Sequence, residues 1–224
     1  MEKDNKLEQI DALLKVIAQL RDPEKGCPWE KEQTHESLKQ FIIEEAYELV
    51  DAIDQDKSKV CEELGDVLLQ VLLHSQIASE NNEFDFYQVA EELRKKLIRR
   101  HPHVFGDVVA KTAEQVLDTW QKVKKQEKGV LDGVPRALPA LLRATKITDR
   151  ARRSEFKIDP FNEYKLKELL SKITKDDNLD RDDFKQALFQ LAMFTQRHKY
   201  SPEELLQEAC TDFTDEFKKI ESNL

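Results

Sequence analysis

Residues 41–73 read FIIEEAYELVDAIDQDKSKVCEELGDVLLQVLL, and this stretch decides the fold of the chain. Each half carries apolar residues at helical spacing: Ile42, Ala46, Leu49 and Ile53 in the first, and Val60, Leu64, Val67 and Val71 in the second. This spacing predicts two amphipathic helices with buried apolar stripes. The segment between them, 55–58, is short and offers Ser58 as an N-cap. The stretch therefore predicts an antiparallel helix pair, packed stripe against stripe.

The same stretch is acidic, with nine acids against two lysines between residues 44 and 66. Glu45 and Glu48 lie on the row beside the first stripe, and the row beside the second contains Glu63, Asp66 and Gln70. Packing of the two helices would bring the four carboxylates together. Like charges this close raise one another's pKa, so a cluster of this kind usually indicates a bound cation. Ligands that are all oxygen atoms suit Mg²⁺ or Mn²⁺. Two solvated helix faces would show the same pattern.

Gly65 lies inside the second predicted helix, where glycine costs about 1 kcal/mol relative to alanine. Close approach of a ligand or of backbone would explain it. Packing against a neighbouring helix would explain it equally well.

A longer motif connects these acids. It reads Glu44-Glu45-x-x-Glu48, then 14 residues, then Glu63-x-x-Asp66. The segments CPWE (27–30) and QTH (33–35) precede it, and RRHPHVF (99–105) follows it. Over roughly residues 7–150 the chain resembles the MazG family of nucleoside triphosphate pyrophosphohydrolases.

The resemblance implies an all-α, Mg²⁺-dependent enzyme, with Mn²⁺ as a possible substitute. Such an enzyme hydrolyses ribo- or deoxynucleoside triphosphates to the monophosphate and pyrophosphate, as in the house-cleaning of nucleotide pools. It would bind metal through Glu45, Glu48, Glu63 and Asp66, with Glu44 as a further catalytic residue that orients a ligand or accepts a proton. Substrate-binding residues would be Lys59, Lys96, Arg99, Arg100, Trp120 and Lys124. The resemblance also favours a homodimer.

The basic candidates have simpler explanations as well. Lys96 and Arg100 share one face of a predicted helix, 86–100, as two donors gripping a phosphate chain would. Cations at a helix C-terminus also favour the macrodipole. Trp120 and Lys124 follow a capping box, Thr112-x-x-Gln115, and suit either base and phosphate contacts or an apolar anchor beside a solvated lysine.

The remainder of the chain is expected to be helical. Further helices are predicted at about 7–22, 137–150, 164–173 and 182–197, with a last one opened by Ser201-Pro202-x-Glu204. Residues 26–34 and the His101-Pro102-His103 segment are predicted as loops.

The second half of the chain resembles the first at an offset of 120 residues. Residues 182–191 then align with residues 62–71 and keep the apolar pattern, but Gly65 becomes Lys185 and Asp66 becomes Gln186. This favours a decayed copy that has lost its metal ligands, although two unrelated amphipathic helices would align in the same way. We therefore expect an all-α chain of two related modules: a MazG-like catalytic module at 1–130 and a degenerate one at 131–224.

The composition of the chain argues against some classes of binding partner. The net charge of -9 argues against broad nucleic-acid binding. The three cysteines show no paired spacing, as in a reducing cytosol, and Gln70 and His74 interrupt the longest apolar run. We expect a soluble cytoplasmic protein whose partners include neither nucleic acid nor membrane.

Three other classes of protein are alternatives to this interpretation. A di-iron carboxylate bundle needs two Glu-x-x-His motifs, and only Glu32-x-x-His35 is present. An HD-type phosphohydrolase needs a His-Asp doublet, and none of the five histidines precedes an aspartate. The alternative that remains is a catalytically weak helical dimer that acts as a regulatory interaction scaffold.

Overall fold

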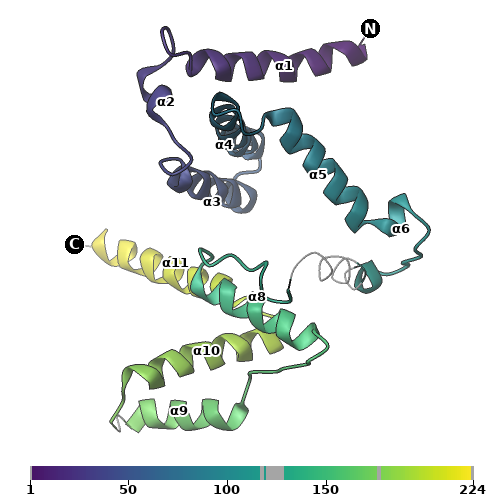
Figure 1. Ribbon diagram of the computed structural model, residues 1–224. Helices are drawn as coiled ribbons and strands as arrows, with labels where there is room; N and C mark the ends of the chain where they lie inside the picture. The colour runs from purple at the N-terminus through teal and green to yellow at the C-terminus, as the bar shows by residue number, and fades with distance from the viewer. Residues whose placement is uncertain (1, 117–118, 120–128, 176–177, 223–224) are drawn as a thin grey trace. The chain divides into compact units, whose positions relative to one another are not determined.

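The computed structural model describes residues 2–116, 119, 129–175 and 178–222, with side chains from residue 8 onward (Figure 1). These residues form helices and no strand, which confirms the all-α prediction. The chain divides into two compact units, 1–109 and 110–224. No helix within the described ranges combines the length and the apolar character needed to cross a membrane.

The first unit is built around an antiparallel hairpin. Its helices are α1 (Glu2–Leu20), α2 (Pro28–Glu32), α3 (Lys39–Gln55), α4 (Val60–Glu80), α5 (Phe86–Arg100) and α6 (Pro102–Phe105). Figure 1 shows α4 between α1 and α3, and α5 also packs on α4. The core that joins them consists of Ile17, Leu38, Leu72, Leu73 and Ile77.

The face that α3 turns toward α4 differs from the prediction. Ile42 and Ile53, expected to be buried, are 37% and 49% exposed. The inward row instead contains Leu38, Phe41, Glu45, Leu49 and Ala52. It shares Leu49 with the predicted stripe, while Phe41, Glu45 and Ala52 each lie one residue before a predicted position. Glu45 therefore lies on the facing row and is half-buried.

The sequence signals for helix ends were correct for α5 and wrong for the start of α4. The bounds of α5 match the prediction, and Asp85 opens it with a capping box. Ser58 is not the N-cap of α4: its hydroxyl donates to Asp56 Oδ1 at 2.6 Å, and Lys59 takes the cap position. The two predicted loops contain the short helices α2 and α6, because Pro28 and Pro102 each suit the first turn of a helix.

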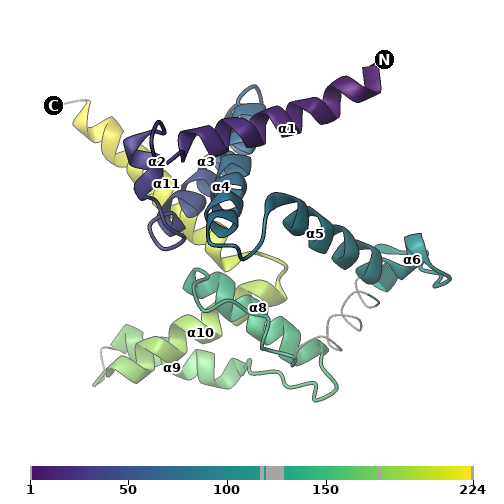
Figure 2. The same cartoon turned by 45° about the horizontal axis from the view of Figure 1, so that its top comes forward.

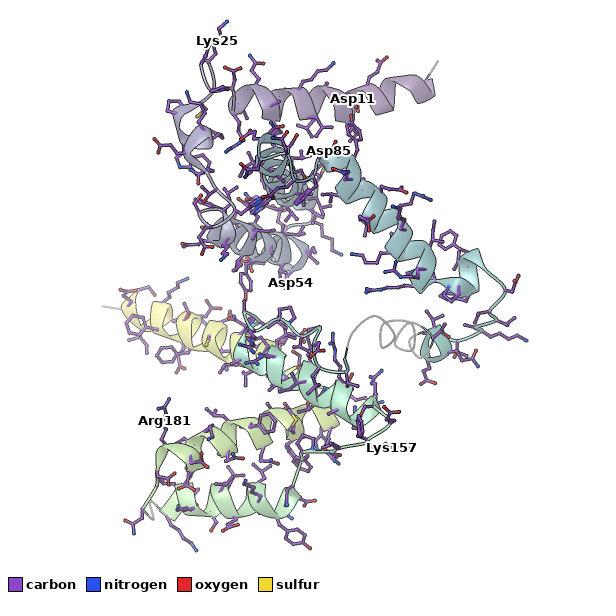
Figure 3. All side chains as sticks on the ribbon, viewed as in Figure 1. Asp11, Lys25, Asp54, Asp85, Lys157 and Arg181 are labelled. Carbon is purple, nitrogen blue, oxygen red and sulfur yellow. The ribbon has the colours of Figure 1, made fainter. Side chains whose placement is uncertain are left out.

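A side-chain contact fastens α1 to α5. Figure 3 shows Asp11 of α1 beside the start of α5, where Asp85 lies. The Tyr87 hydroxyl of α5 donates to Asp11 Oδ1 at 2.6 Å. This bond links the first turn of α5 to α1 at the surface of the unit.

The second unit consists of α8 (Ala140–Arg153), α9 (Glu163–Lys175), α10 (Arg181–Arg197) and α11 (Pro202–Glu221). Both views show α10 between α8 and α9 (Figures 1 and 2). The helix bounds lie close to the predicted ones, and the Ser201 side chain accepts from the Glu204 N–H, as expected at the start of α11. That the two units are related modules, with a boundary at residue 130, stays a prediction.

Candidate functional site

An acidic cluster lies between α3 and α4. Glu45 and Glu48 of α3 and Glu63 of α4 each place one carboxylate oxygen within 4.8 Å of the other two. Asp66, one turn after Glu63, lies close enough to raise the pKa of both Glu45 and Glu63. The i, i+3 spacing on each helix and the antiparallel packing of the pair produce this arrangement.

Electrostatics at the cluster favour a cation. The pKa of Glu45 is raised by burial and then by the neighbouring charges of Asp66, Glu48, Glu44 and Glu63. The pKa of Glu63 is raised by burial and by Glu48, Asp66 and Glu62, against a smaller lowering effect of Lys59. A divalent cation would relieve this repulsion.

The donor set fits a hard ion. All of the candidate ligands are carboxylate oxygens, which suit Mg²⁺ or Mn²⁺ better than softer metals. A Cβ placed on Gly65 would meet no atom within 4 Å in the described part of the chain. Packing against another described helix of the first unit therefore does not explain the glycine.

The segment that enters the hairpin is held by Arg21. Its guanidinium donates to both carboxylate oxygens of Glu80, with 2.8 Å from Nη2 to Oε2, and to the carbonyl oxygens of Glu30 and Gln33. This positions Trp29, whose ring meets that of Phe41 edge to face at 5.5 Å. An aromatic pair is thereby fixed at the start of α3.

Comparison with known proteins identifies the family. The model of the MazG nucleotide pyrophosphohydrolase domain matches residues 33–105, which include the whole acidic cluster. A Thermotoga maritima protein named nucleoside triphosphate pyrophosphohydrolase/pyrophosphatase MazG is 40% identical over 222 residues, covering 95% of this chain and 85% of the relative. The chain belongs to the MazG family.

Two further MazG-like relatives match over a shorter span. An Escherichia coli protein named nucleoside triphosphate pyrophosphohydrolase is 45% identical over 151 residues, which is 64% of this chain and 57% of that protein. YabN of Bacillus subtilis, described as uncharacterised, is 48% identical over 153 residues, or 65% of this chain and 31% of YabN. The match thus spans just under a third of YabN and just over half of the Escherichia coli protein.

The substrate-binding residues expected from MazG lie in several places. Lys59 is at the N-cap of α4, where its charge acts on Glu63. Lys96 and Arg99 are exposed and Arg100 is half-buried near the end of α5. Trp120 and Lys124 lie outside the described residues. The roles of these residues stay predictions.

Other basic residues of α5 are occupied within their own helix. Arg94 forms an ion pair with Glu91 at 2.6 Å, and Lys95 forms one with Glu92 at 3.0 Å. The two acids lie one turn before the cations, so this part of α5 is neutralised locally.

The polar row that the sequence predicts on α4, with Glu63, Asp66 and Gln70, continues to His74, which sequence reasoning did not include. Gln70 and His74 follow Asp66 at i+4 and i+8, and Gln70 is only 4% exposed. His74 Nδ1 lies 2.7 Å from Nδ1 of His35, just before α3. The sequence signals were the helical spacing of Gln70 from Asp66 and the interruption of an apolar run by Gln70 and His74.

The two histidine rings share one proton between them. Their planes are parallel within 4° and their centroids are 5.0 Å apart, which with the short Nδ1–Nδ1 distance places them edge to edge. One ring must donate and the other accept, so the accepting Nδ1 carries no proton. Burial, and then the charge of His35, lower the pKa of His74.

In the second hairpin, α9–α10, lysines lie beside the two residues of α10 that align with Glu63 and Asp66. Lys172 forms an ion pair with Asp183, and Lys165 Nζ donates to Gln186 Oε1 at 3.1 Å. Asp183 and Gln186 align with Glu63 and Asp66 of the MazG motif. Side-chain ammonium groups therefore lie beside this pair, whereas at Glu63 the charge of Lys59 is outweighed by those of the neighbouring carboxylates.

Proposed function

We propose that this chain hydrolyses nucleoside triphosphates between the α and β phosphates, giving a monophosphate and pyrophosphate. The observation that carries the proposal is the cluster of three carboxylate oxygens within 4.8 Å, contributed by two facing helices. Family membership supports it, because the relatives from Thermotoga maritima and Escherichia coli are named for this activity.

The acidic cluster would hold Mg²⁺, or Mn²⁺ in its place, through Glu45, Glu48, Glu63 and Asp66. When bound, the ion would polarise the phosphoryl group and make a bound water more acidic. The four carboxylates would orient the ion, and the charge of the ion would reduce the repulsion between a chain of net charge -9 and a polyanionic substrate. Glu44, exposed beside the cluster, would orient a ligand or accept a proton from the attacking water.

Phosphates and base would be held by the other predicted residues. Lys59, Lys96, Arg99 and Arg100 would bind phosphate oxygens, as would Lys124. Trp120 would stack on the base, and stacking tolerates different bases. A broad substrate range of this kind suits house-cleaning of the cytoplasmic nucleotide pool.

We further propose that the working form is a homodimer. The outer face of the α3–α4 hairpin exposes a set of large apolar residues: Ile42, Ile43, Tyr47, Val50, Ile53 and Leu64. A second copy of the chain would cover these residues and help to enclose a triphosphate.

The second unit has a different proposed role. Because lysines already stand beside Asp183 and Gln186, this hairpin needs no added cation. The alternative function, a catalytically weak regulatory scaffold, therefore suits this unit better than the first.

The test is pyrophosphate release from a panel of ribo- and deoxynucleoside triphosphates, with Mg²⁺ and with EDTA. Glu48→Ala and Asp66→Ala should abolish Mg²⁺-dependent release without unfolding the chain. Glu168→Ala is the matched control, because Glu168 is exposed on α9 and aligns with Glu48. Turnover that survives both site variants would place the site elsewhere, and no turnover in the unaltered chain would favour the scaffold.

A further inference from the structure

Gln70 presents an unusual acceptor beside the acidic cluster. Its side chain lies inside the hairpin, and its Oε1 has no hydrogen-bond partner among the described residues. Buried amide oxygens are nearly always paired, because an unmade bond destabilises the folded chain. The unpaired acceptor therefore points to a group that the described residues do not supply.

The neighbours of Gln70 on α4 show which way the residue faces. One turn earlier, Asp66 acts on Glu45 of α3. One turn later, His74 bonds to His35 just before α3. Residues at this spacing share one helix face, so Gln70 faces α3 at a level between Glu45 and His35. It lies about 6 Å along the helix from Asp66.

The second unit provides an internal comparison. Gln190 aligns with Gln70 and is equally buried, at 3% exposure. Its Oε1 accepts from the Asn162 N–H at 2.8 Å, and its Nε2 donates to the Pro160 carbonyl at 3.0 Å. The Gln190 amide is thus paired with backbone groups in the second hairpin, whereas Gln70 Oε1 has no partner among the described residues in the first.

The chemistry of the acceptor selects the part of the substrate that it meets. Ionised phosphate oxygens are acceptors and would repel an amide oxygen, whereas base N–H groups and sugar hydroxyls are donors. We propose that Gln70 Oε1 accepts a hydrogen bond from an N–H or O–H of the nucleoside while the triphosphate is held at the acidic cluster. This assignment rests on the function proposed above, and makes Gln70 a determinant of substrate specificity.

The test compares Gln70→Met with Gln190→Met, since methionine is unbranched and removes the amide at similar length. Gln70→Met should raise KM roughly 3- to 10-fold with kcat nearly unchanged, as expected for loss of one hydrogen bond made equally in ground and transition states. Its unfolding temperature should stay the same or rise, because a buried unpaired acceptor is removed. Gln190→Met should do the reverse, lowering the unfolding temperature while leaving KM unchanged.

The substrate panel identifies the donor. Ribo- and deoxynucleotides with the same base test a sugar hydroxyl, and base analogues that lack one N–H or amino group test the base. The pair whose KM ratio falls toward one in Gln70→Met contains the donor group.

The outcomes separate the two proposals. If the unaltered chain releases no pyrophosphate, the proposed function fails and the role of Gln70 fails with it. If the chain turns over but Gln70→Met keeps its KM for every substrate, or loses stability as Gln190→Met does, Gln70 is a packing residue and only this inference is overturned.

Discussion

Removal of the Glu80 carboxylate should destabilise the first unit, because it leaves the buried Arg21 guanidinium without its counterion. The Arg21 side chain is 6% exposed, and that of Glu80 is 36% exposed. The same guanidinium holds the carbonyl oxygens of Glu30 and Gln33. Glu80→Ala therefore leaves a buried charge with two neutral acceptors and no counterion.

The expected cost follows from this geometry. Removal of one partner of a buried ion pair lowers the free energy of unfolding by about 3–5 kcal/mol. Water can reach the place that the partly exposed Glu80 leaves, so we expect about 2 kcal/mol. For a unit of this size that is a fall of about 8 °C in unfolding temperature. Glu80→Gln, which keeps one acceptor, should cost about 1 kcal/mol.

Fluorescence of Trp29 can report the first unit by itself. The chain has two tryptophans, so a Trp120→Phe background leaves Trp29 as the only one. Glu36→Ala is the control, because the Lys39–Glu36 pair is largely exposed and should be worth less than about 1 kcal/mol. If Glu80→Ala moves the Trp29 transition no further than Glu36→Ala does, the reasoning about the Arg21 pair is wrong.

The same pair predicts a response to acid. Burial raises the pKa of Glu80, but hydrogen bonds from Arg21 and Gln76 and the charge of Arg21 lower it below 4.5 overall. The unfolded chain then binds the proton first as pH falls, so the contribution of Glu80 is present above pH 4.5 and is lost as pH falls through the folded pKa. Glu80→Gln should flatten the stability curve in that range.

Three further predictions concern the hairpin. Mn²⁺ at a hundred times its Kd should stabilise the unaltered chain by about 2.7 kcal/mol in calorimetry. Glu48→Gln should lose this stabilisation and Glu168→Gln should keep it. An equal response to Mn²⁺ in both variants would contradict the proposed site. The pKa of His74 is lowered from 6.5 by burial and by His35, so the unfolded state binds the proton more readily and stability should fall as pH drops below 6.5. His74→Phe, which matches Phe194 of α10, should remove that slope in denaturant titrations, and an unchanged slope would count against the shared proton. Gly65→Ala should stabilise α4 by about 0.5–1 kcal/mol, because its Cβ meets open space, and a loss of stability would show that the space is filled.

What the sequence predicted well was local. Helix α5 was placed correctly because residues that begin and end it are near in sequence, as Asp85 and Gln88 are in the capping box. The family motif lies within one hairpin, so spacing alone could show that its carboxylates meet.

The errors came from tertiary packing. Periodicity chose the Ile42 row of α3 because it counts only apolar residues, whereas the row that faces α4 includes Glu45. The Arg21–Glu80 and His35–His74 contacts join residues 59 and 39 positions apart, and no local pattern specifies such pairs. Gln70 was visible as an interruption in an apolar run, but its open acceptor could be found only in the packed hairpin.

The most direct measurement is identification of the products of one nucleoside triphosphate by phosphorus-31 nuclear magnetic resonance, with the chain and Mg²⁺. The account predicts that the triphosphate signals give way to those of a monophosphate and pyrophosphate, and that EDTA prevents the change. A nucleoside diphosphate and orthophosphate, or conversion that proceeds equally in EDTA, would contradict it.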